Sequence, residues 1–318
     1  MKQMMLQSKQ KGFTLLELLV VITLLAVLSV GALIAYEGIG DNAQATAAAN
    51  NTAGVDRAIR NFRAVSLTYP NQWDNLVQEG SALTFDGLTE VAADADEAAK
   101  KPLVVARPTR NAFGSWNIAA DAQTKSNVMA AFDAVGIDEV QQMTALATGK
   151  APNVQHNEGA NAAAHDLEMV DPLFTHVSIM PSSVGATACT AGTASIATNF
   201  AGDAPVAVTN DYGLKLNAIN DSLDPALCQL VIALGFGHDA AHSTADSPAA
   251  IVTAATYSSK AINPANSYGR YVALFHVGTG NATTITSADI HKKAHLIAIV
   301  DTEGNSIDTN IANATATN

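Results

Sequence analysis

The sequence is poor in charged residues, aromatic residues and cysteine. Only 14% of its 318 residues are Asp, Glu, Lys or Arg, and 5% are aromatic, whereas charged residues usually make up about a quarter of a protein. Two cysteines are too few for a disulfide-rich scaffold, and no CxxC motif is present for thiol redox chemistry or haem attachment. The net charge of −12 argues against a nucleic-acid partner, because phosphate binding needs clustered Lys and Arg.

The sequence also lacks the motifs of common enzymes. It has no GxSxG, P-loop or paired-carboxylate pattern. The lone GxG at residues 235–237 has no third glycine and predicts a turn. His238 with His242, and His291 with His295, have the i,i+4 spacing of a zinc pair on a helix, but neither pair has the HExxH glutamate. We therefore expect surface or half-buried histidines, no cofactor and no enzymatic activity.

Hydrophobic residues are concentrated near the N-terminus. Residues 13–36 contain 15 Leu, Ile, Val or Phe residues and one charge, Glu17. As a helix they would span roughly 36 Å, enough to cross a bilayer core of about 30 Å. Their side chains favour insertion by roughly 5 to 9 kcal/mol, against about 3 kcal/mol for one carboxylate. The run predicts a membrane-spanning helix.

The flanking residues predict its orientation. Lys2, Lys9 and Lys11 precede the apolar run without any acidic residue, so the positive-inside rule leaves the N-terminus in the cytoplasm and the rest outside. An ordinary signal peptide would have an apolar region of about 7 to 15 residues and a small-residue cleavage site. The apolar run at residues 13–36 is longer than that. A plain membrane anchor would give no reason for Glu17, because an intramembrane carboxylate is by default functional.

Residues 11–17 (KGFTLLE) and the apolar run after them resemble the class III signal of type IV pilins and type II secretion pseudopilins. The resemblance implies that a prepilin peptidase cuts between Gly12 and Phe13 and methylates the new amine. It also implies that Glu17 pairs with the N-terminal amine of a neighbouring subunit during filament assembly. Phe13 and Glu17 are four residues apart and share a helix face. An unpaired charge in low dielectric costs several kcal/mol, which would favour packing in register.

The pattern after residue 36 becomes amphipathic. Val55, Ile59, Phe62, Val65 and Tyr69 recur at spacings of three and four, as on one buried helix face. The proline after Tyr69 is expected to end the helix. We therefore divide the chain into a leader (1–12), an N-terminal helix (13–69, with 13–36 in the membrane) and a globular domain (70–318).

The globular part has an α+β pattern. Segments 126–136 and 138–149 predict short helices that each end at a glycine. Strand-like runs follow later, separated by Gly, Asn, Asp and Pro, at 173–180, 228–236, 249–257, 270–278 and 294–302. Helix first and strands last agrees with the family's long helix packed on a C-terminal antiparallel sheet. Because the chain is much longer than a small pilin, residues 92–170 are interpreted as a mixed insertion.

Cys189 and Cys228 lie outside the membrane in this topology. A bridge between them would close a loop of about 40 residues and contribute roughly 3.9 kcal/mol on the chain-entropy model. Pilins often carry a disulfide in the C-terminal region, so the resemblance favours this pairing. Two buried free thiols are the alternative.

The segment 301–308 places oxygen ligands around a glycine. Major pseudopilins use a C-terminal calcium site, so the resemblance makes Asp301, Glu303, Asn305 and Asp308 calcium candidates. The register does not match an EF-hand loop, and a hairpin turn needs the same residue types. The expected metal is therefore none, with calcium as the alternative.

These observations predict a structural protein. The resemblance implies an inner-membrane prepilin, with its C-terminal domain outside, that polymerises into an extracellular or periplasmic filament. Its partners would be copies of itself, the prepilin peptidase and an inner-membrane assembly platform with its ATPase. The residues do not separate a pilus from a pseudopilus. A low-copy minor pilin or adhesin, which presents a binding domain on a pilin stem, is the alternative.

Overall fold

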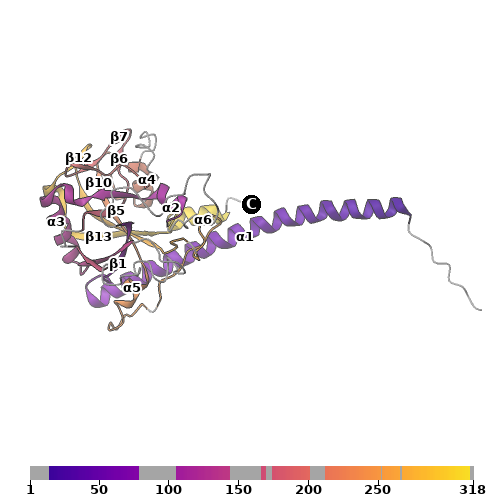
Figure 1. Cartoon of the computed structure of the whole chain (residues 1–318), viewed down its shortest axis with the longest axis horizontal. Helices are drawn as coiled ribbons and strands as arrows, with labels where there is room; N and C mark the ends of the chain where they lie inside the picture. Colours follow the sequence, from indigo (N-terminus) through magenta and orange to yellow (C-terminus); the bar gives the residue numbers. More distant parts are fainter. Residues whose placement is uncertain are drawn as a thin grey trace, which may run out of the picture.

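The computed structural model describes residues 14–78, 105–143, 166–169, 174–200, 212–251, 253–265 and 267–315. Helix α1 (Leu15–Ser66) projects as a long rod from a domain that contains the other helices and the strands (Figure 1). At about 1.5 Å per residue, this 52-residue helix is roughly 78 Å long. The structure confirms the predicted α+β class, with a long N-terminal helix attached to a mainly antiparallel sheet.

The main sheet holds strands from distant parts of the chain. Its path is β13-β11-β10-β1-β3-β4, and β5 pairs with both β10 and β2. The β1–β3 pair is parallel and the other pairs in this sheet are antiparallel. The strands are β1 (Trp73–Gln78), β2 (Gly114–Asn117), β3 (Glu139–Met143), β4 (Asp166–Glu168), β5 (His176–Met180), β10 (Gln229–Gly235), β11 (Val272–Thr279) and β13 (Ile290–Val300).

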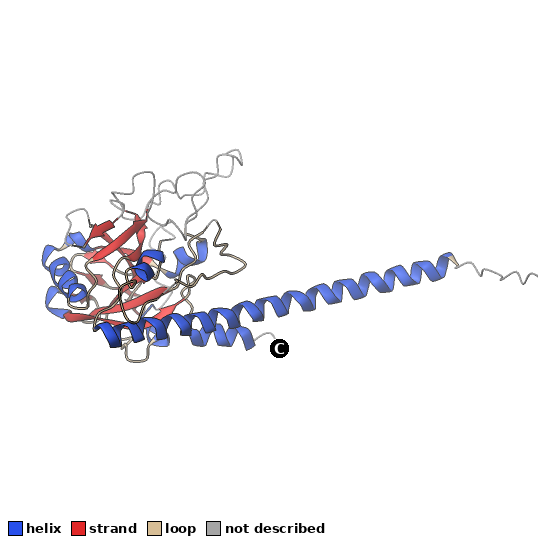
Figure 2. Ribbon diagram, turned by 90° about the horizontal axis from the view of Figure 1, so that it is seen from below, coloured by secondary structure: helices blue, strands red, loops and turns tan. Residues whose placement is uncertain are grey.

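Shorter elements surround this sheet. The strands are β6 (Ser183–Val184), β7 (Thr187–Ala188), β8 (Thr190–Ala191), β9 (Ala194–Ser195) and β12 (Thr284–Ile285). The helices are α2 (Arg107–Ala112), α3 (Ala122–Asp133), α4 (Tyr212–Ile219), α5 (His238–His242) and α6 (Ile307–Thr315), with single 3-10 turns at η2 (Ile118–Ala120) and η4 (Ser287–Asp289). Figure 2 shows α1 passing along the sheet domain, with α6 beside it.

The sheet buries side chains on both faces, as β11 shows. Ala273 and Phe275 belong to a core that includes residues of α1 and α3, whereas Val272 and Leu274 belong to a second core with residues of α2 and α4. Successive residues of a strand point to opposite faces, so this alternation places β11 between the two cores. The ring of Phe275 lies about 5.3 to 5.5 Å from three other aromatic rings, those of Tyr69, Trp73 and Phe132.

The second half of α1 packs on the domain through one face. Val55, Ile59 and Phe62 are buried as predicted, but Val65 is 56% exposed. A helix turns by about 100° per residue, so the buried stripe passes through Ser66, which is half-buried, and leaves Val65 about 80° to the side. The prediction for Val65 is therefore wrong.

Leu67 ends the helix before the proline is reached. Its φ of 63° is left-handed, and its N–H donates to the carbonyl oxygen of Arg63 at 2.8 Å. This C-cap satisfies one of the free carbonyls in the last turn. Tyr69 follows outside the helix, where its side chain is buried against Phe275.

Two sequence-based assignments differ from the structure. The segment predicted as a second short helix begins instead with β3, which pairs in parallel with β1. Val140 and Gln141 are both buried there, so neighbouring strands and helices determine the structure more than local propensity does. Among the described residues of 249–257, which was predicted as a strand, the sheet pairing is a single isolated bridge from Thr256 to Arg270. Both edges of β11 are already occupied, by β10 and β13.

The interval 92–170 is described only at 105–143 and 166–169. These two pieces contribute β2, β3 and β4 to the same sheet as the C-terminal strands. They also contribute Phe132 and Val140 to the shared core. The interpretation of the whole interval as an insertion stays a prediction.

Candidate functional site

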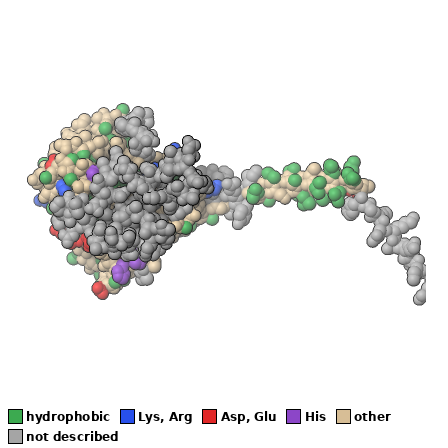
Figure 3. Space-filling view, in the orientation of Figure 1, with side chains coloured by type: hydrophobic (Ala, Val, Ile, Leu, Met, Phe, Trp, Pro, Cys, Tyr) green, Lys and Arg blue, Asp and Glu red, His purple; other side chains and the backbone are tan. Residues whose placement is uncertain are grey.

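The first half of α1 presents apolar side chains to its surroundings. The segment Leu15–Leu33 has a mean hydropathy of 2.6, and none of it is buried in the domain. Within the described part of the chain, one helix is long and apolar enough to cross a membrane, and this is that segment. Figure 3 shows its hydrophobic side chains on the projecting rod. Such a surface is stable in lipid or against other apolar helices and unfavourable in water.

The polar side chains of this segment bond to its own backbone. Thr23 Oγ1 donates to the carbonyl oxygen of Val20 at 2.9 Å, and Ser29 Oγ donates to that of Leu25 at 2.7 Å. Unpaired polar groups are costly in a bilayer core. These local bonds therefore make both hydroxyls compatible with an apolar environment.

Glu17 closes a capping box at the start of α1. Its Oε2 accepts hydrogen bonds from the backbone N–H of Thr14 at 2.9 Å and from Thr14 Oγ1 at 3.0 Å. The N–H of Glu17 donates to Thr14 Oγ1 at 3.3 Å. The carboxylate is thus folded back over the positive end of the helix dipole. Gly12 and Phe13, the predicted processing residues, lie outside the described residues.

Helix α6 lies against α1 where α1 leaves the domain (Figures 1 and 2). The loop before α6 is organised by Asp301, whose carboxylate accepts bonds from the backbone of Glu303 and Asn305, both at 2.9 Å. The side-chain amides of Asn305 and Asn310 donate to its other oxygen, at 3.3 and 3.0 Å. Burial raises the pKa of Asp301.

These contacts bear on the calcium candidates. Asp301, Glu303 and Asn305 lie in one loop, whereas Asp308 is an exposed residue in the first turn of α6. Both oxygens of Asp301 accept hydrogen bonds from N–H donors, so a calcium ion would compete with those donors for the same lone pairs. The expectation of no metal, with calcium at this loop as the alternative, stays a prediction.

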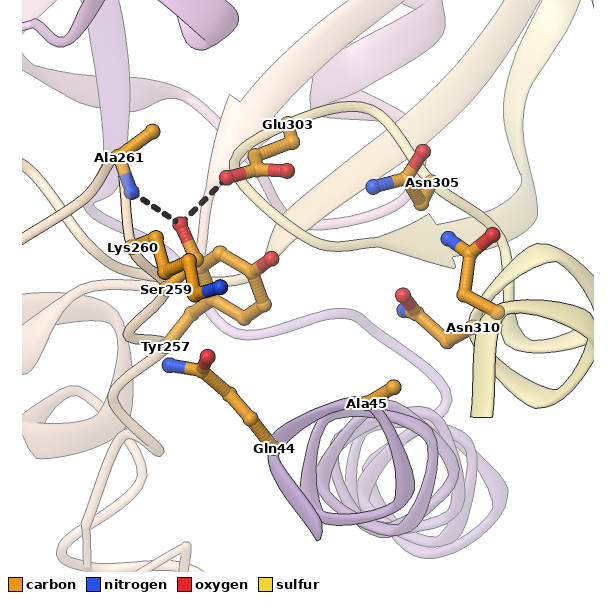
Figure 4. Close-up of a pocket in the computed structure, with 10 residues that line it drawn as sticks. Gln44, Ala45, Tyr257, Ser259, Lys260, Ala261, Glu303, Asn305 and Asn310 are labelled. Atoms are coloured by element: carbon orange, nitrogen blue, oxygen red, sulfur yellow. Dashed lines mark hydrogen bonds between the residues drawn. The ribbon is translucent and has the colours of Figure 1, made fainter. Parts of the chain in front are cut away.

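A polar pocket of about 320 Å³ lies between this loop, α6 and α1 (Figure 4). The Oγ of Ser259 donates to Glu303 Oε1 and accepts the N–H of Ala261. Amide, hydroxyl and carboxylate groups of this kind can hydrogen-bond a polar ligand. The lining residues are Gln44, Ala45, Tyr257, Ser259, Lys260, Ala261, Glu303, Asn305, Asn310 and Asn313.

Asp74 is a fully buried carboxylate that the sequence analysis missed. Its Oδ2 accepts a hydrogen bond from the hydroxyl of Tyr268 at 2.7 Å, and burial raises its pKa to about 7. The GxG glycines adjoin this pair: a Cβ at Gly235 would collide with Tyr268, and one at Gly237 with Asp74. The turn predicted there connects β10 to α5, and its glycines make room for the buried pair.

Five of the six histidines in the described part of the chain form two groups. The rings of His238 and His242 stand on α5, 6.1 Å apart and nearly parallel. On β11 and β13, His291 lies 4.7 Å from His276 and 6.0 Å from His295, with inclined rings. Burial lowers the pKa of His276 to about 4. No group of three or more His, Cys, Asp or Glu side chains among the described residues is placed to hold a metal ion.

The structure also joins Cys189 and Cys228 in a disulfide, with their Cα atoms 5.7 Å apart. Both residues are fully buried in the core that includes the first face of β11. The bond ties the β7–β8 segment to the start of β10. The disulfide is far along the chain from the apolar helix, and it stabilises the fold of the domain.

The apolar, unburied segment at the start of α1 is, by its length and composition, able to cross a membrane. Residues 7–33 match the family model of the prokaryotic N-terminal methylation motif. The chain therefore carries the class III prepilin signal of type IV pilins and pseudopilins, and its N-terminal part is that of a pilin-like precursor. No curated protein and no solved structure matches the chain.

Proposed function

We propose that this protein is a structural subunit of a type IV pilus-like or type II secretion pseudopilus filament. The precursor is anchored in the inner membrane with its domain outside. A prepilin peptidase cuts it after Gly12, and an assembly platform with its ATPase then packs the apolar helices of many copies into a fibre.

The observation that carries the proposal is the apolar segment Leu15–Leu33, unburied in the monomer and covered by the prepilin motif. A soluble protein would bury such a surface in its own core. Here the helix continues without interruption into the buried face at Val55 and Ile59. Packing one anchor against another would therefore bring the attached domains into a regular array.

The capping box supports a role for Glu17 in that packing. In the chain before cleavage, its carboxylate is held by Thr14 at the extreme start of α1. Cleavage after Gly12 would create an amine one residue before Thr14. The carboxylate is then positioned near the new N-terminus, where a neighbour's amine can pair with it in low dielectric.

The first test separates processing from assembly. Gly12→Val should leave an unprocessed species about 12 residues longer on a gel in cells that contain a prepilin peptidase. Normal maturation of Gly12→Val would refute the cleavage assignment.

Glu17→Ala and Glu17→Gln should both be processed but give few sheared filaments, because neither has a charge to pair with the amine. Asp221→Ala, a substitution of an exposed acid in a turn after α4, is the control and should assemble normally. Abundant filaments from both Glu17 variants would contradict the pairing mechanism.

A second candidate is a minor subunit that presents a binding domain. The polar pocket beside Tyr257 and Glu303 favours it, because its groups can contact a polar ligand. Copy number distinguishes the two: quantitative mass spectrometry of filaments should find this chain as the main component if it is the major subunit, and as a trace component if it is a tip protein.

A further inference from the structure

Helix α5 displays two histidines on one side and buries its other side. Ala240 and Ala241 are buried against the domain, whereas His238 and His242 are exposed. Residues four apart lie one above the other on a helix. Figure 3 shows a histidine patch on the surface at the position of α5 in Figure 1.

The two imidazole rings are already arranged side by side. Their planes differ by 8°, and their centroids are 6.1 Å apart. Nδ1 of His238 lies 3.4 Å from Oδ1 of Asp239. A carboxylate beside Nδ1 favours the tautomer that carries its proton there, which leaves Nε2 free as a ligand. In many metal sites a carboxylate accepts a hydrogen bond from one nitrogen of a histidine, and the other nitrogen of that histidine binds the metal.

The short helix is fixed to the domain at both ends. Gly237 precedes it, packed against buried Asp74. After it, Ser243 Oγ accepts the N–H of Asn71 at 3.1 Å, and Thr244 Oγ1 accepts the N–H of Ile251 at 2.7 Å. A chelate on a fixed backbone loses little entropy when an ion binds.

We propose that His238 and His242 form a surface chelate for a divalent transition-metal ion, with Cu²⁺ bound most tightly and Ni²⁺ and Zn²⁺ more weakly. Imidazole suits these ions, and affinity for a given site rises along the series to Cu²⁺. Hard cations such as Ca²⁺ and Mg²⁺ prefer oxygen ligands and are excluded by the two nitrogens. Water would occupy the remaining coordination positions. The inference is independent of filament assembly.

The second histidine group differs in geometry. His291 and His295 share the same spacing, but they stand on a strand with rings inclined by 64°. Nε2 of the nearby His276 is already in hydrogen-bonding contact with Gln229 and Gly278, both at 3.0 Å. The two pairs therefore provide a matched comparison within one molecule.

The test is Cu²⁺ binding to the full chain in detergent at pH 7.5, followed by calorimetry and by electron paramagnetic resonance. The wild type should bind one Cu²⁺ tightly, with hyperfine splitting from two imidazole nitrogens. His242→Gln should weaken that affinity roughly a hundredfold, because a chelate becomes a single ligand. His295→Gln should bind as the wild type does.

Three further measurements keep the result decisive. Thermal unfolding should show that each variant folds. Asp239→Asn should weaken binding less than His242→Gln does, because it removes an orienting group and leaves both ligands in place. Excess EDTA should remove the ion and return the protein to its metal-free state, which a reversible chelate requires. Unchanged Cu²⁺ affinity in His242→Gln would overturn the proposal, and so would an equal loss in His295→Gln.

Discussion

Asp74 lies in the core at the start of β1, where water cannot solvate its charge. The hydroxyl of Tyr268 donates to it, and the charges of Asp239 and Arg270 act on it from nearby elements. The net result is a pKa of about 7, mainly because burial penalises the ionised form. A carboxyl group with such a pKa is neutral in mildly acidic solution and ionised in mildly alkaline solution.

The raised pKa predicts a pH-dependent stability. An unfolded Asp has a pKa of about 3.9, so between pH 4 and pH 7 the folded state holds a proton that the unfolded state has lost. The free energy of unfolding therefore decreases as pH rises from 4 to 7. Below and above this range, the contribution of Asp74 to that free energy does not change with pH. Asp74→Asn cannot ionise and keeps an oxygen for Tyr268. It should unfold at a higher temperature than the wild type at pH 8.

The free energy of unfolding of Asp74→Asn should exceed that of the wild type by roughly 4 kcal/mol at most at pH 8. This difference in free energy should shrink to near zero at pH 4. Thermal unfolding in detergent at several pH values measures it. Asp308→Asn removes an exposed carboxylate and should leave the shape of the curve unchanged. A constant offset between wild type and Asp74→Asn across this range would contradict the raised pKa.

The sequence contains little that would identify Asp74. It is one acid in a short apolar run, and its partner Tyr268 is 194 residues away. Burial there depends on the pairing of β1 with β10 and on the space left by Gly235. Glu17 was singled out through the resemblance of residues 11–17 to the prepilin signal. Its capping box with Thr14 was not predicted, although the two residues are only three apart in the sequence.

At the scale of elements, α1 joins two environments through one continuous helix. Its first half is unburied, and its second half contributes Val55 and Ile59 to the domain core. Ile59 is fully buried, whereas Val65, six residues later and on a different side of the helix, is 56% exposed. The two positions therefore differ in burial while sharing the same helix.

Truncation at these two positions should have unequal effects. Ile59→Ala leaves a cavity under α1 and should lower the free energy of unfolding by about 2 to 5 kcal/mol. Val65→Ala removes an exposed side chain and should change it by less than about 0.5 kcal/mol. Denaturant unfolding of the full chain in detergent measures both. Equal losses would show that the helix packs through a wider face than the one described.

Some elements of the fold could be predicted from the sequence and others could not, for physical reasons. The apolar anchor, β10, β11 and β13 have long uniform patterns and were predicted from them. The segment at β3 has helix-compatible residues, and its strand structure depends on the parallel pairing with Asp74 and its neighbours. The segment 249–257 has β-branched residues, but β11, the strand that follows its bridge partner Arg270, is already paired on both edges. Local composition contains no information about either circumstance.

The whole molecule consists of an apolar rod and a domain with polar sites. Leu15–Leu33 is unburied, and an apolar surface of this kind is more stable in a bilayer or against other apolar helices than in water. Leu24→Arg places a charge at the middle of this segment and should cost about 2.5 to 3.5 kcal/mol of insertion free energy. Less of the chain should then remain in membranes after alkaline extraction. Leu67→Arg, at an 82% exposed position outside the segment, adds the same charge and should not change the membrane-bound fraction.

The unbroken backbone of α1 has a geometric consequence. Between Leu33 and Gln44 the helix continues with no loop to absorb rotation. Each residue of a helix advances the phase by about 100°. One residue inserted or deleted in this stretch would therefore turn the domain, and the histidine pair on α5 with it, to a different azimuth around the rod. The length of the stretch sets the angle at which the domain faces outward.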